Sequence, residues 1–346
     1  MTAPLGAGLI GAGWMGAFHG ESLARRVPGA RLAMVADPAP GAAARLAGPA
    51  GGRATTDPAE LIADPEVEAV VIAAPARFHA DLVVAAAAAG KAVFCEKPMA
   101  LTLADADRAI AAAERAAVPL QAGFNRRFDA SFAAAREAVA SGRVGTPQLL
   151  RSLTRDPAVP GGFDPARVPP WTIYLETLIH DFDTLRYLNP RAEAVSVYAV
   201  ADALTRPDWK DRGLLDTSVV TIRFDNGAMA TAEASFHAVY GYDIRGEVFG
   251  SAGMVTAGDV RRDTMTCYGE AGAASATWRR NVDLFRDAYV AELAEFTACV
   301  REKRTPPVTG QDARAALAIA LAAIRSVQAG APVRMADIET APAAAR

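Results

Sequence analysis

The sequence contains little cysteine. It has three cysteines, Cys95, Cys267 and Cys299, in 346 residues. They are odd in number and widely spaced, so they match neither a disulfide framework nor a zinc-ligand pattern. Such cysteine use is typical of a reducing compartment. Since no signal peptide is apparent either, we expect a cytoplasmic protein.

The sequence also lacks long apolar runs and a strong charge of one sign. Its apolar runs, such as residues 82–89, are far shorter than the roughly 20 residues that span a bilayer. The formal net charge of −3 gives no reason to expect nucleic acid or an anionic membrane as a partner. A chain of 346 residues with ordinary charge content is long enough for two globular domains.

What the sequence does contain is a glycine-rich turn near its start. Gly11, Gly13 and Gly16 form a G-x-G-x-x-G motif between a short apolar run and a segment with helical spacing. The first glycine permits a sharp turn, the second lets a pyrophosphate approach the backbone, and the third lets the helix pack closely. The N–H groups at the helix start, at Trp14 and Met15, would then face the phosphates.

A carboxylate follows this motif at the expected distance. The apolar run of residues 32–36 ends in Asp37, about 20 residues beyond the last glycine. Its side chain can accept hydrogen bonds from the adenosine ribose hydroxyls and would repel the 2′-phosphate of NADP. Pro38 comes next, with no arginine beside it, so we predict NAD rather than NADP. The alternative is a turn whose glycines serve packing alone.

Strand-like and helix-like segments alternate through the first third of the chain. The alternation predicts an α/β fold with a parallel, doubly wound sheet, which we expect to form a first domain at residues 1–122. Buried strands are predicted at residues 69–74, 92–95 and 119–124, with helices at residues 77–89 and 102–117.

The pattern changes after residue 123. Asp225-Asn226-Gly227 predicts a tight hairpin turn, which indicates an antiparallel or mixed sheet. We expect this sheet to be open and mainly antiparallel, in a second α/β domain at residues 123–340. An uncovered apolar face on such a sheet would favour self-association. Strands are predicted at residues 148–154, 194–200, 217–224, 228–236 and 242–249, and helices at residues 129–141, 173–188, 287–303 and 311–328.

Glu96-Lys97-Pro98 is the first candidate for chemistry. It follows a predicted strand, and ligands of parallel sheets bind beyond the carboxyl ends of the strands. Lys97 could there stabilise negative charge that develops on a substrate oxygen. Alternatively, it is a surface lysine at the start of a helix.

A second candidate lies on a predicted helix. Glu176, His180 and Asp183 are spaced i, i+4 and i+7, so they share one face. A histidine held by a carboxylate is a ready proton acceptor near neutral pH. The alternatives are a core histidine, a solvated charged stripe, or a Glu-x-x-x-His metal site. No third ligand stands at a recognisable spacing, so we predict no metal.

Two further side chains could meet a ligand. Arg127 follows the last predicted strand of the first domain, where it could bind a polyol or an anion, or brace the domain junction. Tyr240 precedes a predicted strand, where a half-buried packing role is the usual alternative to ligand binding.

Three motifs therefore occur in one order: Gly11-Ala12-Gly13-Trp14-Met15-Gly16, Glu96-Lys97-Pro98 and His180-Asp181-Phe182-Asp183. Together they resemble the glucose–fructose oxidoreductase / inositol dehydrogenase / MocA family over nearly the whole chain. Residues 124–129, 155–157 and 240–243 are most similar to the inositol 2-dehydrogenase branch. The resemblance implies a Rossmann domain, a second domain with a large open sheet, and a homo-oligomer, a dimer or tetramer, formed through that sheet.

The resemblance also implies roles for individual residues. Lys97 matches the catalytic lysine and His180 the proton acceptor, and Glu176 replaces the usual aspartate four residues earlier. The positions that match polyol contacts are Arg127, Asp156 and Tyr240. The positions implied to bind the cofactor are Gly11, Gly13, Trp14, Met15, Gly16, Asp37, Pro75, His79 and Glu96.

Three departures from the family pattern bear on the substrate. Glu176 is one methylene longer than aspartate, and Ala74-Pro75-Ala76 stands where Thr-Pro-Asn is commoner. Residues 164–171 also lack the Gly-rich form expected of an ordinary inositol enzyme. These differences affect the identity of the substrate more than the type of reaction.

The sequence thus predicts an NAD-dependent dehydrogenase that oxidises a secondary hydroxyl of a cyclic polyol or sugar by hydride transfer. One alternative is a glycosidase that uses bound NAD for a transient oxidation. Another is a non-catalytic dinucleotide-binding regulator, which would need neither Lys97 nor His180.

Overall fold

The computed structural model describes residues 3–157, 168–212 and 214–340, which fold as two compact units. The first unit comprises Met1–Phe128 and Asp287–Ala315, and the second comprises Asp129–Arg286 and Ala316–Arg346. None of the helices in the described part of the chain combines the length and the apolar character needed to cross a bilayer.

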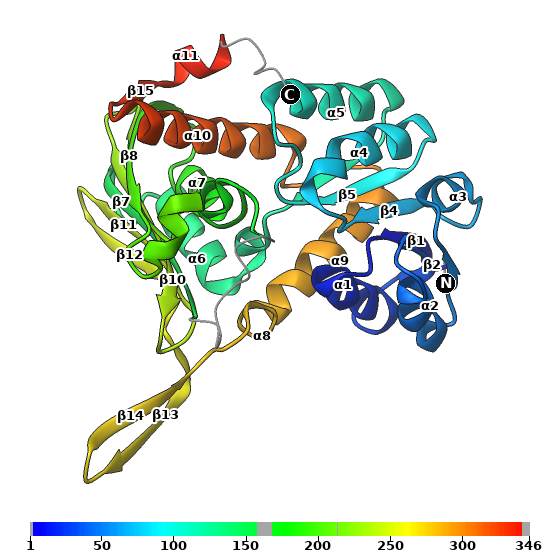
Figure 1. Ribbon diagram of the computed structural model, residues 1–346, viewed down its shortest axis with the longest axis horizontal. Helices are drawn as coiled ribbons and strands as arrows, with labels where there is room; N and C mark the ends of the chain where they lie inside the picture. Colours follow the sequence, from blue (N-terminus) through cyan, green and yellow to red (C-terminus); the bar gives the residue numbers. More distant parts are fainter. Residues whose placement is uncertain (1–2, 158–167, 213, 341–346) are drawn as a thin grey trace. The chain divides into compact units, whose positions relative to one another are not determined.

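Six parallel strands form the sheet of the first unit, in the order β3-β2-β1-β4-β5-β6 (Figure 1). This order is that of the Rossmann fold, so the predicted doubly wound sheet is confirmed. The strands are β1 (Leu5–Ile10), β2 (Ala30–Ala36), β3 (Arg53–Thr55), β4 (Ala69–Ile72), β5 (Ala92–Glu96) and β6 (Leu120–Gly123). The helices are α1 (Trp14–Arg25), α2 (Ala42–Ala47), α3 (Pro58–Ala63), α4 (His79–Ala88), α5 (Leu103–Ala116) and nearly all of α9 (Arg286–Glu302).

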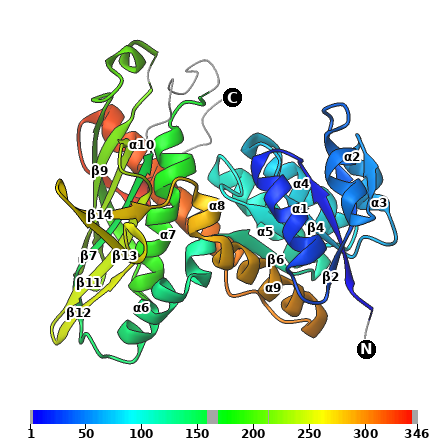
Figure 2. The same ribbon diagram turned by 90° about the horizontal axis from the view of Figure 1, so that it is seen from below.

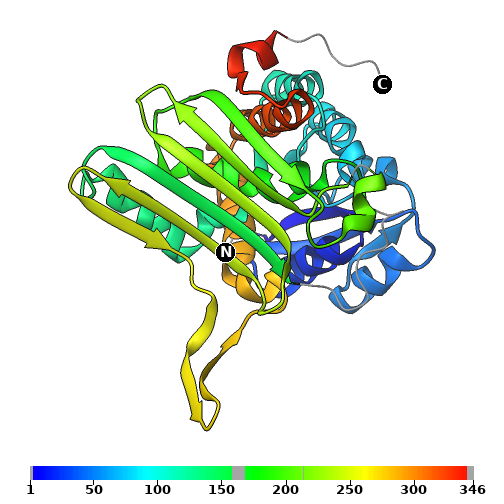
Figure 3. The same cartoon turned by 60° about the vertical axis from the view of Figure 1, so that its left-hand side comes forward.

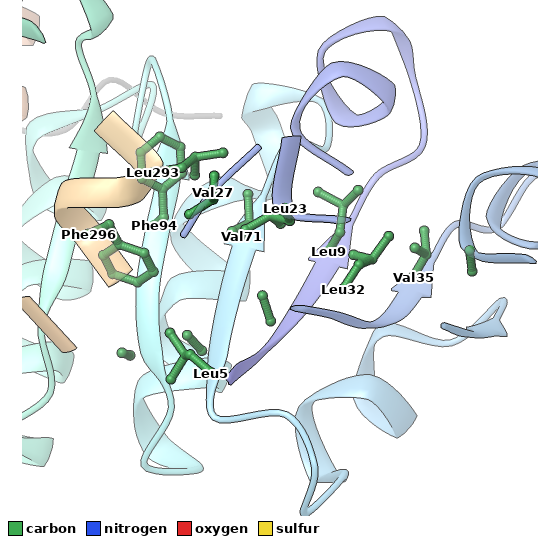
Figure 4. Packing of buried hydrophobic residues seen from close by; sticks show 14 of the residues in the cluster. Leu5, Leu9, Leu23, Val27, Leu32, Val35, Val71, Phe94, Leu293 and Phe296 are labelled. Atoms are coloured by element: carbon green, nitrogen blue, oxygen red, sulfur yellow. The ribbon is translucent and has the colours of Figure 1, made fainter. Parts of the chain in front are cut away.

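The core of the first unit is built on strands that are apolar on both faces. Leu9 of β1, Val71 of β4 and Phe94 of β5 are completely buried, as a sheet covered on both sides requires. Helix α9 adds Leu293 and Phe296 to the same cluster (Figure 4). The spacing of apolar residues in α9 predicts a helix, but it does not predict which sheet that helix covers.

The second unit contains a seven-stranded sheet in the order β12-β11-β7-β10-β9-β8-β15. Among the described strands of this sheet, only β7 and β10 pair in parallel, so the predicted open, mainly antiparallel sheet is confirmed. Its strands are β7 (Pro147–Pro157), β8 (Ala194–Asp202), β9 (Thr217–Phe224), β10 (Met229–Ala238), β11 (Asp243–Gly250), β12 (Gly253–Ala257) and β15 (Val333–Arg334). The helices are α6 (Ala130–Ala140), α7 (Ile179–Leu188), α8 (Asn281–Leu284), most of α10 (Gly310–Ala329), and α11 (Met335–Glu339).

The two faces of this sheet differ. Helices α6 and α7 lie along one face (Figure 2), and none of the helices in the described residues lies on the face turned forward in Figure 3. Residues of β9 alternate accordingly: Val220 and Ile222 are buried, whereas Val219 is exposed. The predicted hairpin turn is present between β9 and β10, where Gly227 has a φ of 88°.

The second unit also differs from the sequence-based prediction in two places. The helix predicted at residues 173–188 begins as a π-helical segment, Ile173–Leu178, before α7 takes over. The hairpin of β13 (Arg261–Gly269) and β14 (Gly272–Thr277) is not predicted by the sequence pattern. Nearly all of its residues are exposed, so the apolar alternation that reveals a half-buried strand is absent.

Candidate active site

The glycine turn joins β1 to α1 in the first unit. Gly11 has a φ of 99°, a conformation that L side chains rarely adopt. A Cβ at Gly16 would lie 1.9 Å from the carbonyl oxygen of Gly11, whereas a Cβ at Gly13 would meet nothing within 4 Å. Gly11 and Gly16 are therefore required by the fold itself, and Gly13 leaves the turn open on one side. Trp14, the first residue of α1, is 57% exposed, and Met15 beside it is half-buried.

Asp37 lies directly beyond β2 and is tied to this turn. Its Oδ2 accepts a hydrogen bond from the Ala12 N–H at 2.7 Å, and its Oδ1 accepts one from the Ala39 N–H at 2.8 Å. The pairing of β1 with β2 brings these residues together. The turn and the carboxylate thus fit the phosphates and the ribose of a dinucleotide.

His79 links the turns that follow β4 and β5. Its Nδ1 lies 2.8 Å from the carbonyl oxygen of Pro98, and its Nε2 lies 2.7 Å from that of Ala74. Both ring nitrogens therefore contact the backbone, so His79 holds Pro75 and Lys97 in place through the residues next to them. The Lys97–Pro98 peptide bond is cis.

Glu96, at the end of β5, is buried and anchors the residue that follows it. Its Oε2 accepts a hydrogen bond from the Lys97 N–H at 3.2 Å, and its Oε1 lies 2.6 Å from His19 Nε2 on α1. Burial opposes ionisation of Glu96, but the hydrogen bond to His19 and the nearby charge of Lys97 outweigh it and lower its pKa. His19 belongs to none of the sequence motifs, although it lies one helical turn beyond the last glycine of the G-x-G-x-x-G motif.

The second unit holds the other catalytic candidates. Glu176 lies in the π-helical segment and His180 in the first turn of α7, and both are partly exposed. Asp183, predicted to share their face, is buried. The adjacent Asp181, which the sequence analysis assigned no role, is completely buried and fixes α7 to the sheet. It accepts hydrogen bonds from Ser152 Oγ at 2.5 Å and Thr154 Oγ1 at 2.6 Å.

Arg127 forms an ion pair within the first unit. One of its terminal nitrogens lies 2.9 Å from Asp312 Oδ1. Burial would raise the pKa of Asp312, but the Arg127 charge and hydrogen bonds from Thr309 lower it. This contact braces the start of α10 whether or not Arg127 also binds a ligand.

The other two predicted polyol contacts lie in the second unit. Asp156 is half-buried near the end of β7. Burial, and then the charge of Asp156, raise the pKa of Tyr242 well above its usual value. The Tyr240 hydroxyl donates a hydrogen bond to Asp243 Oδ2 at 2.8 Å. Residues 164–167 of the segment 164–171 lie outside the described residues.

Family models match both halves of the chain. Residues 5–124 match "Oxidoreductase family, NAD-binding Rossmann fold", and residues 132–256 match the GFO/IDH/MocA C-terminal domain. A myo-inositol 2-dehydrogenase of Thermotoga maritima is 39% identical over 333 residues, which cover 96% of this chain and 98% of the relative. The scyllo-inositol 2-dehydrogenase (NAD(+)) of Bacillus subtilis is 35% identical over 336 residues, 96% of each chain.

Solved structures agree with these matches. A scyllo-inositol dehydrogenase from Lactobacillus casei, with bound NAD(H) and scyllo-inositol, has a TM-score of 0.92 and 25% identity. The match covers 96% of this chain and 99% of that one. A dehydrogenase from Thermotoga maritima has a TM-score of 0.91 and 39% identity over 96% of this chain and all of its own. The chain belongs to the Gfo/Idh/MocA family of NAD-binding oxidoreductases, as its three motifs predict.

Proposed function

We propose that this protein is an NAD-dependent dehydrogenase that oxidises one secondary hydroxyl of a cyclic polyol or sugar of the inositol kind. The observation that carries the proposal is the match, over almost the whole chain, to inositol dehydrogenases that include one with NAD(H) and scyllo-inositol bound. The open backbone at Gly13 and the Asp37 carboxylate tied to the same turn fit a dinucleotide independently of those relatives.

NAD is preferred to NADP in this proposal. The Ala12 N–H holds the Asp37 carboxylate at the glycine turn. There the carboxylate would accept hydrogen bonds from the ribose hydroxyls and repel a 2′-phosphate. Gly13, Trp14 and Met15 would contact the pyrophosphate, and Gly11 and Gly16 would shape the turn that receives it. Bound NAD supplies the acceptor for the hydride that leaves the substrate carbon.

The chain's own residues supply the proton transfer and the charge stabilisation. His180 takes the hydroxyl proton, oriented by Glu176, and Lys97 stabilises the negative charge that develops on the oxygen. Glu96 and His79 position Lys97 through the contacts described above, and Pro75 borders the cofactor. Arg127, Asp156 and Tyr240 would bind the remaining hydroxyls of the substrate.

We further propose a division of labour between residues 1–122, which bind NAD, and residues 123–340, which bind substrate and form a homo-oligomer. The support for self-association is the helix-free face of the second sheet. Four apolar side chains on neighbouring strands are 45–57% exposed there: Leu149, Met229, Phe249 and Met254. Light scattering coupled to size exclusion would reveal a dimer or tetramer. The composition supports a cytoplasmic location.

The test is NADH absorbance with a panel of inositols, aldoses and glycosides. A dehydrogenase forms NADH with a free polyol or sugar. A glycosidase that oxidises transiently would release sugar without net NADH, and a regulator would do neither.

Lys97→Met should lower kcat roughly 10²- to 10³-fold and leave NAD affinity nearly unchanged. The matched control is Lys210→Met, which removes an exposed lysine paired with Asp202. Full turnover by the Lys97 variant would refute its role.

A further inference from the structure

A buried cluster of three ionisable side chains in the first unit includes Glu96, which accepts a hydrogen bond from the N–H of Lys97. His19 comes from α1, Glu96 from β5 and Glu292 from α9, and they are 0%, 5% and 0% exposed. One nitrogen or oxygen atom from each lies within 4.8 Å of the others. Neither carboxyl oxygen of Glu292 forms a hydrogen bond with the described part of the chain.

The surroundings of Glu96 and Glu292 allow only one of the two carboxyl groups to be ionised. Aromatic rings pack edge-on against His19, with ring centroids 5.6 Å from Phe94 and 6.0 Å from Tyr289. Two carboxylates this close in an apolar interior cannot both be ionised. Burial, and then the charge of Glu96, raise the pKa of Glu292 well above its usual value, whereas the pKa of Glu96 is lowered. Glu292 is therefore the neutral acid and Glu96 the carboxylate.

Other titratable groups also face this carboxylate. Burial, and then the charge of Glu96, raise the pKa of the Cys95 thiol well above its usual value, so Cys95 stays neutral. Positive charge on Lys97 and His79 favours the ionised form of Glu96. Lys97 is thus a group outside the cluster whose backbone N–H binds Glu96 and whose positive charge favours the ionised form of that carboxylate.

We propose that Glu292 is a positioning residue for Lys97: as a neutral acid it donates a hydrogen bond to Glu96 and keeps that carboxylate ionised against Lys97. This inference rests on the proposed catalytic role of Lys97. The Glu96 carboxylate accepts a hydrogen bond from the Lys97 N–H and balances the charge of the Lys97 ammonium group. Loss of the hydrogen bond from Glu292 would therefore affect both the backbone and the ammonium group of Lys97. One oxygen of each carboxyl lies within 4.8 Å of the other, and the Glu292 carboxyl has no other hydrogen-bond partner among the described residues.

The distances within the cluster fit direct hydrogen bonds better than a bound metal ion. Two ligands of one zinc ion, each about 2.0–2.1 Å from the metal, lie about 3.3 Å apart in tetrahedral geometry. His19 Nε2 and Glu96 Oε1 are only 2.6 Å apart, which is a direct hydrogen bond.

The decisive comparison is between Glu292→Gln and Glu292→Leu. Both side chains are close to glutamate in size, but only the carboxamide can donate to Glu96. Without a donor, Glu96 takes up a proton more readily. The pH at which kcat/KM falls to half on the acid side of the profile should therefore shift upward by about one unit. We expect kcat of the leucine variant to fall about tenfold with little change in the KM for NAD. The glutamine variant should match the wild type.

Phe296→Leu is the control for damage to the core. It lies one helical turn along α9 and packs on Phe94 without a polar contact. It should lower the thermal stability and leave the pH profile unchanged. A leucine variant of Glu292 with the wild-type profile would overturn the inference. So would a glutamine variant as impaired as the leucine variant, or a stoichiometric divalent metal in the purified protein.

The charge on Glu292 can be measured without turnover. In protein labelled with ¹³C-glutamate, the carboxyl resonance that disappears in Glu292→Gln should have the shift of a neutral acid at pH 7. An ionised carboxylate there would overturn the inference even if the enzyme is active. If the acid is neutral but Lys97→Met retains full turnover, the proposed catalytic role fails and the inference about positioning fails with it.

Discussion

Gly13→Ala and Gly16→Ala separate a glycine that serves the cofactor from a glycine that serves the fold. The new methyl group of Gly16→Ala would lie 1.9 Å from the carbonyl oxygen of Gly11, whereas that of Gly13→Ala would have nothing within 4 Å. The same small change therefore tests packing in one variant and access to the backbone in the other.

The two variants should differ in stability. Gly16→Ala forces the helix and the turn apart, and overpacking of this kind costs about 1–3 kcal/mol. At about 2–4 °C per kcal/mol, its Tm should fall by roughly 2–12 °C. Gly13 has a φ of −69° and a ψ of −167°, which alanine adopts readily. The Tm of Gly13→Ala should therefore stay within about 2 °C of the wild type.

The order reverses for cofactor binding. A methyl group at position 13 keeps the pyrophosphate away from the N–H groups of the turn. Loss of one hydrogen bond to a charged group costs about 1.5–3 kcal/mol, so the Kd for NADH should rise roughly 10- to 150-fold. Fluorescence titration with NADH and calorimetry on the same preparations measure both effects.

The control is Gly48→Ala, which adds a methyl group with nothing within 4 Å, beside α2. It should change neither the Tm nor the Kd. Wild-type NADH affinity in Gly13→Ala would refute the reasoning that the backbone at this position approaches the cofactor.

Three further predictions concern carboxylates. Asp37→Ser should weaken NAD binding about tenfold and raise the ratio of kcat/KM for NADP to that for NAD; an unchanged ratio would contradict the assignment. Asp181→Ala leaves two buried hydroxyls on β7 without this acceptor and should lower the free energy of unfolding by roughly 2–4 kcal/mol, measured by urea titration. Despite burial, Arg127 holds the pKa of Asp312 below its usual value of 3.8, so this carboxylate stabilises the fold above that value and less as pH falls below it. In Arg127→Met, the loss of Tm between pH 5 and pH 3 should therefore be smaller than in the wild type.

Much of the fold could be read from local patterns. Apolar runs and the glycines between them predict the parallel strands because each strand is buried on both faces within a few residues. The alternation along β9 and the Asp225-Asn226-Gly227 turn predict an antiparallel sheet for the same local reason. The π-helical segment escaped prediction because its side-chain spacing does not reveal which backbone carbonyl each N–H will reach.

The candidate site was only partly accessible in this way. Motifs give Gly11, Lys97 and His180 because each depends on a short stretch of chain. The partners of Glu96 were missed because His19 and Glu292 stand far away in the sequence. Nothing in the neighbourhood of either residue shows that it will face a buried carboxylate.

The sequence by itself thus determined the Rossmann sheet, the glycine turn with Asp37, and the order of the three family motifs. Only the tertiary structure decided that α9 covers the first sheet and brings Glu292 to Glu96, and that Asp181 fastens α7 to β7. The physical reason is how far apart in the sequence the interacting residues lie. Turns and strand periodicity depend on neighbours along the chain, whereas burial, and the charge that a buried group can carry, depend on side chains that only folding brings together.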